Sequence, residues 1–299
     1  MILPALLAVF LAAPALASET ALFLDIGVGA RALGMGGAYT ALADDSSAVY
    51  WNPAGLARLD KREAAVSHTE LGLGTRETFL AYAHPTGRGT FAGATTYLSR
   101  GSIDGRDAAG RPTGRFEASD AAFAGAYAIK TDLADLGASV KYIRSHIGSL
   151  EAQSGALDFG ARRRLDGVGP GRLMLGAALR NLGPGLKFGD QRSDLPLRLA
   201  LGAAYALPRG LVLALEIQNG PRGAGTEVGF GGEMTAMAGV FARLGYSSKN
   251  AAPAGASFDA ARGLTVGLGF ERAGVRLDYA AQAAGELGAA HRFTLAKRF

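Results

Sequence analysis

From about residue 62 to the last residue, apolar residues alternate with small or charged ones at a period of two. This period is that of a β-strand, in which successive side chains point to opposite faces of a sheet. One run places its apolar residues at every second position: Leu211, Leu213, Leu215 and Ile217. No helical stripe of comparable length interrupts the pattern, so the chain is predicted to be all-β.

The residues on the face opposite the apolar one distinguish a soluble β-sandwich from a transmembrane β-barrel. A soluble β-sandwich buries its apolar faces against each other. Here the face opposite the leucines combines charge with glycine, as in the run that holds Arg172, Gly176 and Arg180. Apolar side chains that face lipid and polar ones that face a lumen are typical of a transmembrane antiparallel β-barrel.

The runs predict about fourteen strands within a barrel of residues 61–299. Their expected spans are 62–71, 75–84, 88–99, 119–131, 136–146, 154–165, 171–181, 196–207, 210–218, 225–236, 239–247, 262–271, 274–281 and 289–299. An even number of strands of about ten residues fits an outer-membrane barrel. A miscounted hairpin would give twelve or sixteen strands instead.

The connections between these runs predict their orientation. Short turns, such as Pro85–Gly87, follow even-numbered strands, and long connections at 101–118, 182–195 and 248–261 follow odd-numbered ones. Outer-membrane barrels have short periplasmic turns and longer extracellular loops. The pattern therefore predicts a barrel that starts and ends in the periplasm.

The first residues predict export. Residues 1–17 are apolar and end in Ala15-Leu16-Ala17, a pattern typical of a signal peptide cleaved before Ser18. The chain has no cysteine, which excludes a disulfide scaffold, and its charge of +5 includes no basic run that favours nucleic acid. The expected location is the bacterial outer membrane, with its lipids as surroundings.

The last strand ends in an aromatic residue. Phe293, Leu295 and Phe299 share the outward face of this strand. A terminal aromatic residue that follows alternating apolar residues resembles the signal recognised by the bacterial barrel-assembly machinery, which is therefore an expected partner.

Residues 18–60 do not alternate and form a separate predicted unit. They are rich in glycine and alanine, a helix is expected to start at 44–47, and Asn52-Pro53 predicts a turn. The stretch 29–38 reads GARALGMGGA, 43–46 reads ADDS and 50–56 reads YWNPAGL. Together these three stretches resemble the N-terminal region of the FadL-like outer-membrane barrels, most closely their PorV/PorQ branch.

That resemblance implies a fourteen-stranded barrel whose N-terminal hatch folds back into the lumen. FadL-type members move hydrophobic compounds across the outer membrane, and PorV-type members assist type IX protein secretion. The hatch residues expected to seal or gate the lumen are Gly34, Met35, Gly36, Gly37, Tyr39, Tyr50, Trp51, Asn52, Pro53 and Gly55. Both roles predict a buried Trp51, the single tryptophan of the chain.

Charged residues on the inward face form a second candidate set. The charges expected to face the lumen are Asp158, Arg172, Arg180, Arg198, Glu216, Glu271, Arg276, Asp278 and Arg292. A ladder of cross-strand ion pairs that fills the barrel and holds the hatch is the favoured interpretation, and a selectivity lining is the alternative.

No motif predicts an enzyme, a metal site or a cofactor. The sequence holds no G-x-S-x-G, H-E-x-x-H or Walker motif, and its four histidines have no partner at metal-ligand spacing. The expected function is the passage of hydrophobic small molecules by a monomeric barrel. A PorV-like part in secretion, with secretion-system proteins as partners, and a purely structural barrel are the alternatives.

Overall fold

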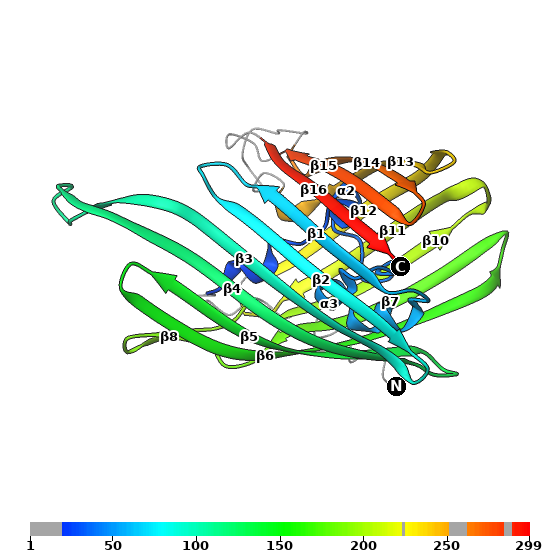
Figure 1. Ribbon diagram of the computed structural model, residues 1–299, viewed down its shortest axis with the longest axis horizontal. Coiled ribbons are helices and arrows are strands. Elements are labelled where there is room, and N and C mark those ends of the chain that lie inside the picture. Colours follow the sequence, from blue (N-terminus) through cyan, green and yellow to red (C-terminus); the bar gives the residue numbers. More distant parts are fainter. Residues whose placement is uncertain (1–19, 223–224, 251–261, 284–288) are drawn as a thin grey trace.

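The computed structural model describes residues 20–222, 225–250, 262–283 and 289–299 (Figure 1). Fourteen antiparallel strands form one closed barrel, in which each strand pairs with its neighbour along the chain and β1 pairs with β16. The predicted all-β barrel and its strand number are thus confirmed. Within the described residues, no helix has the length and apolar character that would let it cross a membrane.

The barrel strands differ in length around the circumference. They are β1 (Glu63–Glu70), β2 (Arg76–Thr86), β3 (Gly89–Arg106), β4 (Pro112–Lys130), β5 (Asp135–Ile147), β6 (Leu150–Val168), β7 (Gly171–Leu182), β10 (Arg198–Ala206), β11 (Leu211–Gly220), β12 (Gly225–Met237), β13 (Val240–Ser247), β14 (Leu264–Arg272), β15 (Val275–Ala283) and β16 (Ala289–Arg298). A separate hairpin, β8 (Leu186–Phe188) and β9 (Gln191–Ser193), lies between β7 and β10.

The alternation sorts side chains between the two faces of the wall. On β14, Leu264, Val266 and Leu268 are exposed outward, whereas Thr265 and Gly267 are buried inward. The proximal end of the barrel is defined here as the end where β1 starts and β16 finishes. The distal end is the opposite one, which carries the β1–β2 and β3–β4 turns.

The prediction of a long connection at 101–118 is wrong, because most of these residues belong to strands. β3 continues to Arg106 and β4 begins at Pro112, so that the hairpin rises well beyond its neighbours (Figure 1). The pairing shifts register between Ser99 and Ser102, and the ladder then resumes with Ser102 opposite Glu117. This irregularity broke the period of two in the sequence, and the polar residues beyond it suggested a loop.

The N-terminal segment, residues 20–60, forms four short helical turns. They are η1 (Leu22–Asp25), α2 (Ala30–Gly34), α3 (Ala48–Trp51) and η2 (Pro53–Arg58). The helix expected from 44–47 begins at Ala48, and its N-cap Ser47 makes no capping bond; instead Asp45 accepts from Ser47 N at 3.0 Å. Most of the segment is buried against the inward face of the barrel.

The segment runs the length of the lumen. Thr20 N donates to the Asp194 carbonyl, which belongs to the distal β7–β10 connection, at 2.8 Å. At the other end, the segment leads into β1 beside Phe299, whose N–H donates to the Arg62 carbonyl at 2.9 Å. The barrel itself starts with β1 and ends with β16 at the proximal end, so its start and its end lie on one side as expected, whereas Thr20 of the segment lies distally.

The closing seam between β1 and β16 supplies a test of the topology. Ser67 and Thr294 are directly opposed, and the Thr294 hydroxyl donates to Ser67 Oγ at 3.0 Å. Because the chain has no cysteine, a Ser67→Cys/Thr294→Cys variant should form one disulfide that links the first and last strands. Non-reducing electrophoresis after proteolysis between the two sites detects it. Ser67→Cys/Ala290→Cys, which is offset along β16, is the control, and equal cross-linking in both variants would contradict the register.

Candidate functional site

Inward glycines form a cradle for the N-terminal segment. A Cβ built on Gly245 would lie 2.2 Å from Gly36 N, and one on Gly231 would lie 2.4 Å from the Met35 carbonyl oxygen. In all, this close approach to the segment backbone occurs on six strands. The glycines of this cradle are Gly137, Gly160, Gly176, Gly202, Gly229, Gly231 and Gly245. Side chains at these positions would occupy the space that the segment backbone fills.

One strand of this row carries an acid instead of a glycine. Glu216 of β11 lies between Gly202 and Gly229 in the sheet. Its Oε2 accepts hydrogen bonds from the backbone N–H groups of Tyr39 and Thr40, at 2.9 and 2.8 Å. The carboxylate thus satisfies the buried Thr40 N–H and shares the Tyr39 N–H with the Gly37 carbonyl, which lies 2.8 Å from Tyr39 N.

Asn52 of the segment and Arg162 of β6 make further hydrogen bonds around residues 40–43. The Asn52 amide donates to the carbonyls of Thr40 and Ala161, at 2.8 and 3.2 Å. Arg162 of β6 donates to the Ala43 carbonyl at 2.6 Å. These bonds connect residues 40–52 to the wall at several points, so this half of the segment is firmly placed.

Arg31 on α2 connects the segment to a network of wall charges. It bonds Glu233 of β12 through Nε at 2.9 Å and Asp44 of the segment at 2.5 Å. Glu233 also receives Arg243 at 2.6 Å, and Arg243 pairs with Asp278 at 2.8 Å. Pairing of this kind is what makes burial of several charges tolerable inside a wall.

Tyr50 and Trp51 pack against each other and against Arg180 of β7. Their ring centroids are 5.0 Å apart in an edge-on arrangement, and the Arg180 guanidinium carbon lies 5.5 and 5.4 Å from the two centroids. Trp51 Nε1 donates to the Val28 carbonyl at 3.0 Å. Burial raises the pKa of Tyr50 well above its ordinary value, so that its hydroxyl remains a donor, here to the Leu24 carbonyl at 2.9 Å.

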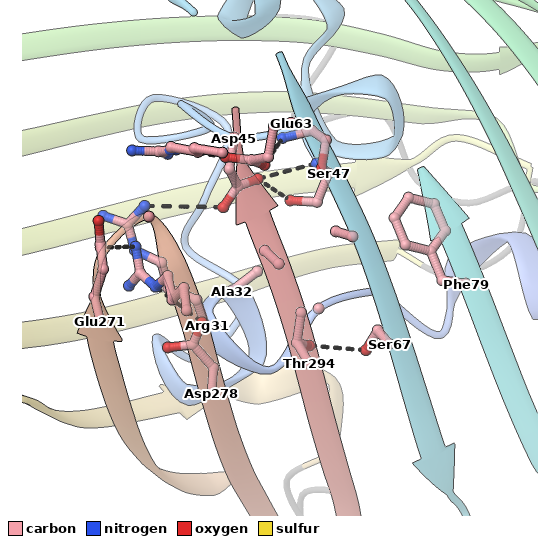
Figure 2. A pocket seen from close by; sticks show the side chains of 17 residues that line it. Arg31, Ala32, Asp45, Ser47, Glu63, Ser67, Phe79, Glu271, Asp278 and Thr294 are labelled. Carbon is pink, nitrogen blue, oxygen red and sulfur yellow. Dashed lines mark hydrogen bonds and ion pairs between the residues drawn. The ribbon is translucent and has the colours of Figure 1, made fainter. Parts of the chain in front are cut away.

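Two hollows lie in the lumen, and α2 separates them. Figure 2 shows the proximal hollow, which is lined by Arg31 and Ala32 of α2, Ser67 of β1, Phe79 of β2 and Thr294 of β16. The distal hollow is lined by Leu33 of α2 together with Tyr50, Trp51 and Arg180. The interatomic space, including the part open to solvent, is about 550 Å³ proximally and about 500 Å³ distally. Each hollow has enclosed room for only a few water molecules.

The distal mouth is closed by an apolar cluster and an ion pair. Phe23 and Leu24 of the segment pack with Leu186 and Leu195 of the β7–β10 connection. Asp25 pairs with Arg198 of β10 at 2.7 Å and with Lys249, in the turn η4 (Ser248–Asn250) after β13. Burial opposes the charge of Asp25, but Lys249 and Arg198 hold its pKa below its ordinary value.

All residues expected in the hatch lie in this segment, and Trp51 is buried, at 5 % exposure. Gly36 and Gly37 have φ of 65° and 76°, a region that favours glycine. Gly55 packs against the Ala43 carbonyl oxygen, which would lie 1.9 Å from an added Cβ. The structure therefore brings residues 34–55 together as one packed unit.

The expected lumen charges lie on the inward face of the barrel, but they differ in their surroundings. Asp158, Arg180, Arg198, Glu216, Asp278 and Arg292 are buried. Arg276 and Glu271 border the proximal hollow. Arg172 lies at the proximal rim, where it is half-exposed and bonds Asp166 at 2.8 Å. The outward residues Phe293, Leu295 and Phe299 are exposed.

Sequence reasoning found part of the wall side of the site, since Arg180, Arg198 and Glu216 were among the expected lumen charges. It singled out neither the cradle glycines nor Arg31, Asp25 and Arg243, because the strands alone do not show which inward positions the segment touches. The chain holds 44 glycines, about twice the usual share, and this excess was the available signal. Small residues clustered on one face of a barrel leave room for another backbone. No group of three or more metal-ligating side chains occurs in the described part of the chain.

Comparisons with known proteins support the fold. The model of an uncharacterised protein family (UPF0164) matches residues 15–158. The toluene transporter TodX of Pseudomonas putida aligns over 90 % of this chain and 96 % of its own, with 13 % identity and a TM-score of 0.63. A FadL homologue of Pseudomonas aeruginosa aligns over 88 % and 95 %, with 12 % identity and a TM-score of 0.55. No curated protein sequence matches. The chain thus has the fold of FadL-like barrels.

The cradle predicts that a single methyl group can displace the segment. Gly245→Ala places a Cβ against the backbone of Met35 and Gly36, and should lower the free energy of unfolding by about 1–3 kcal/mol. Trypsin should then cut faster after Arg31 or Arg58, which the segment packing protects. Scanning calorimetry and timed digestion measure both effects. Gly125→Ala, on the outward face with nothing within 4 Å, is the matched control. If the two variants behave alike, the close packing does not hold the segment.

Proposed function

We propose that this protein is an outer-membrane barrel through which small hydrophobic molecules pass, with residues 20–60 as its gate. The observation that carries the proposal is α2, which lies between two hollows at opposite ends of one lumen. The distal hollow has an aromatic wall, and the proximal one has apolar surface from Ala65, Phe79 and Ala296. A molecule that moved from one hollow to the other would have to displace the α2 segment.

The outer surface supports membrane insertion. Leucine, phenylalanine and tyrosine side chains are exposed around the whole wall, among them Leu80, Phe91, Leu244 and Leu268. A soluble monomer rarely exposes a continuous apolar belt of this kind. The fold of TodX, a toluene transporter, and of a FadL homologue agrees with this placement. We further propose a cleaved signal peptide at 1–17 and outer-membrane location, with the distal end outside the cell.

The gate is closed in this structure. Both hollows are too small for a six-membered ring, and the distal mouth is sealed by Phe23, Leu24, Leu186 and Leu195. Passage therefore requires at least residues 22–37 to shift, since these residues contribute to the distal seal and to α2. The wall bonds of residues 40–52 to Glu216 and Arg162 suit a fixed base for that movement.

A secretion accessory of the PorV type is the second candidate. The closed lumen and the long β3–β4 hairpin, which offers a protruding polar surface, favour it. Purification of the protein from native membranes separates the two candidates. Bound hydrophobic molecules support passage, whereas large secretion proteins that co-purify support the accessory role. Assembly as a monomer by the barrel-assembly machinery, through Phe293, Leu295 and Phe299, belongs to either proposal.

Deletion of the gate should open the lumen. A variant that lacks residues 18–59 retains all strand pairs of the barrel and should still fold, because the ladder closes through β1 and β16. Its conductance in planar bilayers should exceed that of the full protein, since no segment fills the lumen. Heat-modifiable migration on gels is the control for folding. A folded deletion variant with unchanged conductance would show that the segment is not the plug.

Chemical labelling of intact cells can determine which end of the barrel, and of the segment inside it, faces the outside. Leu22 is 55 % exposed at the distal mouth, and Leu73 is 87 % exposed in the distal β1–β2 turn. In intact cells, Leu22→Cys and Leu73→Cys should react with a membrane-impermeant maleimide. Arg88→Cys, in a proximal turn, should react only after lysis. Labelling of Arg88→Cys, but not of the two others, would reverse the proposed orientation.

A further inference from the structure

Arg180 is a buried cation without an ion-pair partner in the described structure. It is 3 % exposed, no carboxylate of the described residues lies within 4.0 Å of its nitrogens, and its Nε has no hydrogen-bond partner among them. Its one hydrogen bond runs from a terminal nitrogen to Gln218 Oε1 at 2.8 Å. Arg31 and Arg243 of the segment interface are paired with acids. Arg292 has no ion pair within 4.0 Å among the described residues either, but it donates to the Ile26 carbonyl and does not line the distal hollow.

Arg180 lies where its unpartnered Nε–H group could bind a ligand. The residue lines the distal hollow, and its guanidinium group lies against the rings of Tyr50 and Trp51. Leu33 and Val228 add apolar surface to the same wall. A molecule that entered this hollow would meet apolar and aromatic surface with one unused N–H group at its edge.

The charges around the hollow determine what kind of acceptor fits. Asp25, Glu216 and Glu227 line it together with Arg180 and Lys249, so the acids outnumber the bases. A further anion would be repelled by the carboxylates, and Lys249 is already paired with Asp25. The missing partner of Arg180 is therefore a neutral oxygen acceptor rather than a second negative charge.

We propose that the distal hollow selects small apolar molecules that carry one neutral oxygen acceptor, such as cyclic or aromatic ketones and aldehydes, over hydrocarbons of equal shape. In the closed structure the distal hollow is too small for such a ring, so the ligand enters when residues 22–37 shift. Arg180, the specificity-determining residue, then donates to the ligand oxygen while the ring of the ligand contacts Tyr50 and Trp51. The inference rests on the proposed passage of hydrophobic molecules and names the subclass that is preferred. Because a buried donor without a partner is costly, an acceptor gains more here than in water.

The test compares cyclohexanone with methylenecyclohexane, which has nearly the same shape but no acceptor. Dissociation constants are measured by titration calorimetry on the full-length protein in micelles, with blank micelles subtracted. The dissociation constant of methylenecyclohexane divided by that of cyclohexanone measures the preference for the ketone. This ratio should be about tenfold larger in the unchanged protein than in Arg180→Met. Arg180→Lys, which keeps the charge but lacks Nε, should also lose most of this preference. Comparing variants cancels the different hydration of the two ligands.

Arg276→Met is the matched control, because Arg276 borders the proximal hollow and is paired with Asp278 at 2.9 Å. It should leave the ratio unchanged. An unchanged ratio in both Arg180 variants would overturn the inference, as would tighter binding of cyclohexanecarboxylate than of cyclohexanone. In the first case continued binding of methylenecyclohexane would leave the proposed function intact. Binding of none of the three ligands would contradict the proposed function as well.

Discussion

The contact between segment backbone and wall backbone is the constraint on which the rest of the structure depends. It is possible because inward positions of β5, β6, β7, β10, β12 and β13 hold glycine where the segment passes. Interiors are packed almost without voids, so a side chain at any of these positions would require either the segment or the strand to move. The glycine excess of the chain thus has a structural cause, and it couples the shape of the lumen to the course of residues 34–54.

Such close packing leaves little room for water, and the inward charges must therefore find partners in the protein. Arg31, Glu233, Arg243 and Asp278 form a connected set that joins α2 to three strands. Loss of one member would leave an opposite charge buried and unpaired, which costs more than the pair itself contributes. The network thus selects one placement of α2. Arg180 lacks such a pairing, and it is also the buried arginine that faces the two large rings of the segment.

The barrel could be predicted from the sequence because its signal is local and repeated. Alternation fixes which face of a strand each residue occupies, and Leu211 to Ile217 shows this within one short run. The β3–β4 hairpin was misjudged, since a register shift at Ser99–Ser102 breaks the period. The course of the segment could not be predicted, because contacts such as Gly36 with Gly245 join residues about two hundred positions apart and leave no periodic trace. The motif residues of the segment were found by their resemblance. Of their wall partners, Glu216 and Arg180 were expected as inward charges, whereas the cradle glycines were not.

The two ends of the segment differ in how they are attached, and this difference indicates how the lumen could open. The proximal end is continuous with β1, and Glu63 at the start of that strand holds both Ser46 N and Arg298. The distal end is held by non-covalent contacts only: the Thr20 N–H bond to the Asp194 carbonyl, the pairs of Asp25 and the packing of Phe23 and Leu24. A covalent connection at one end and separable contacts at the other are the arrangement of a hinged element. Movement should therefore begin distally, where a molecule from outside would arrive first, and the glycine-lined wall would guide the segment without obstructing side chains.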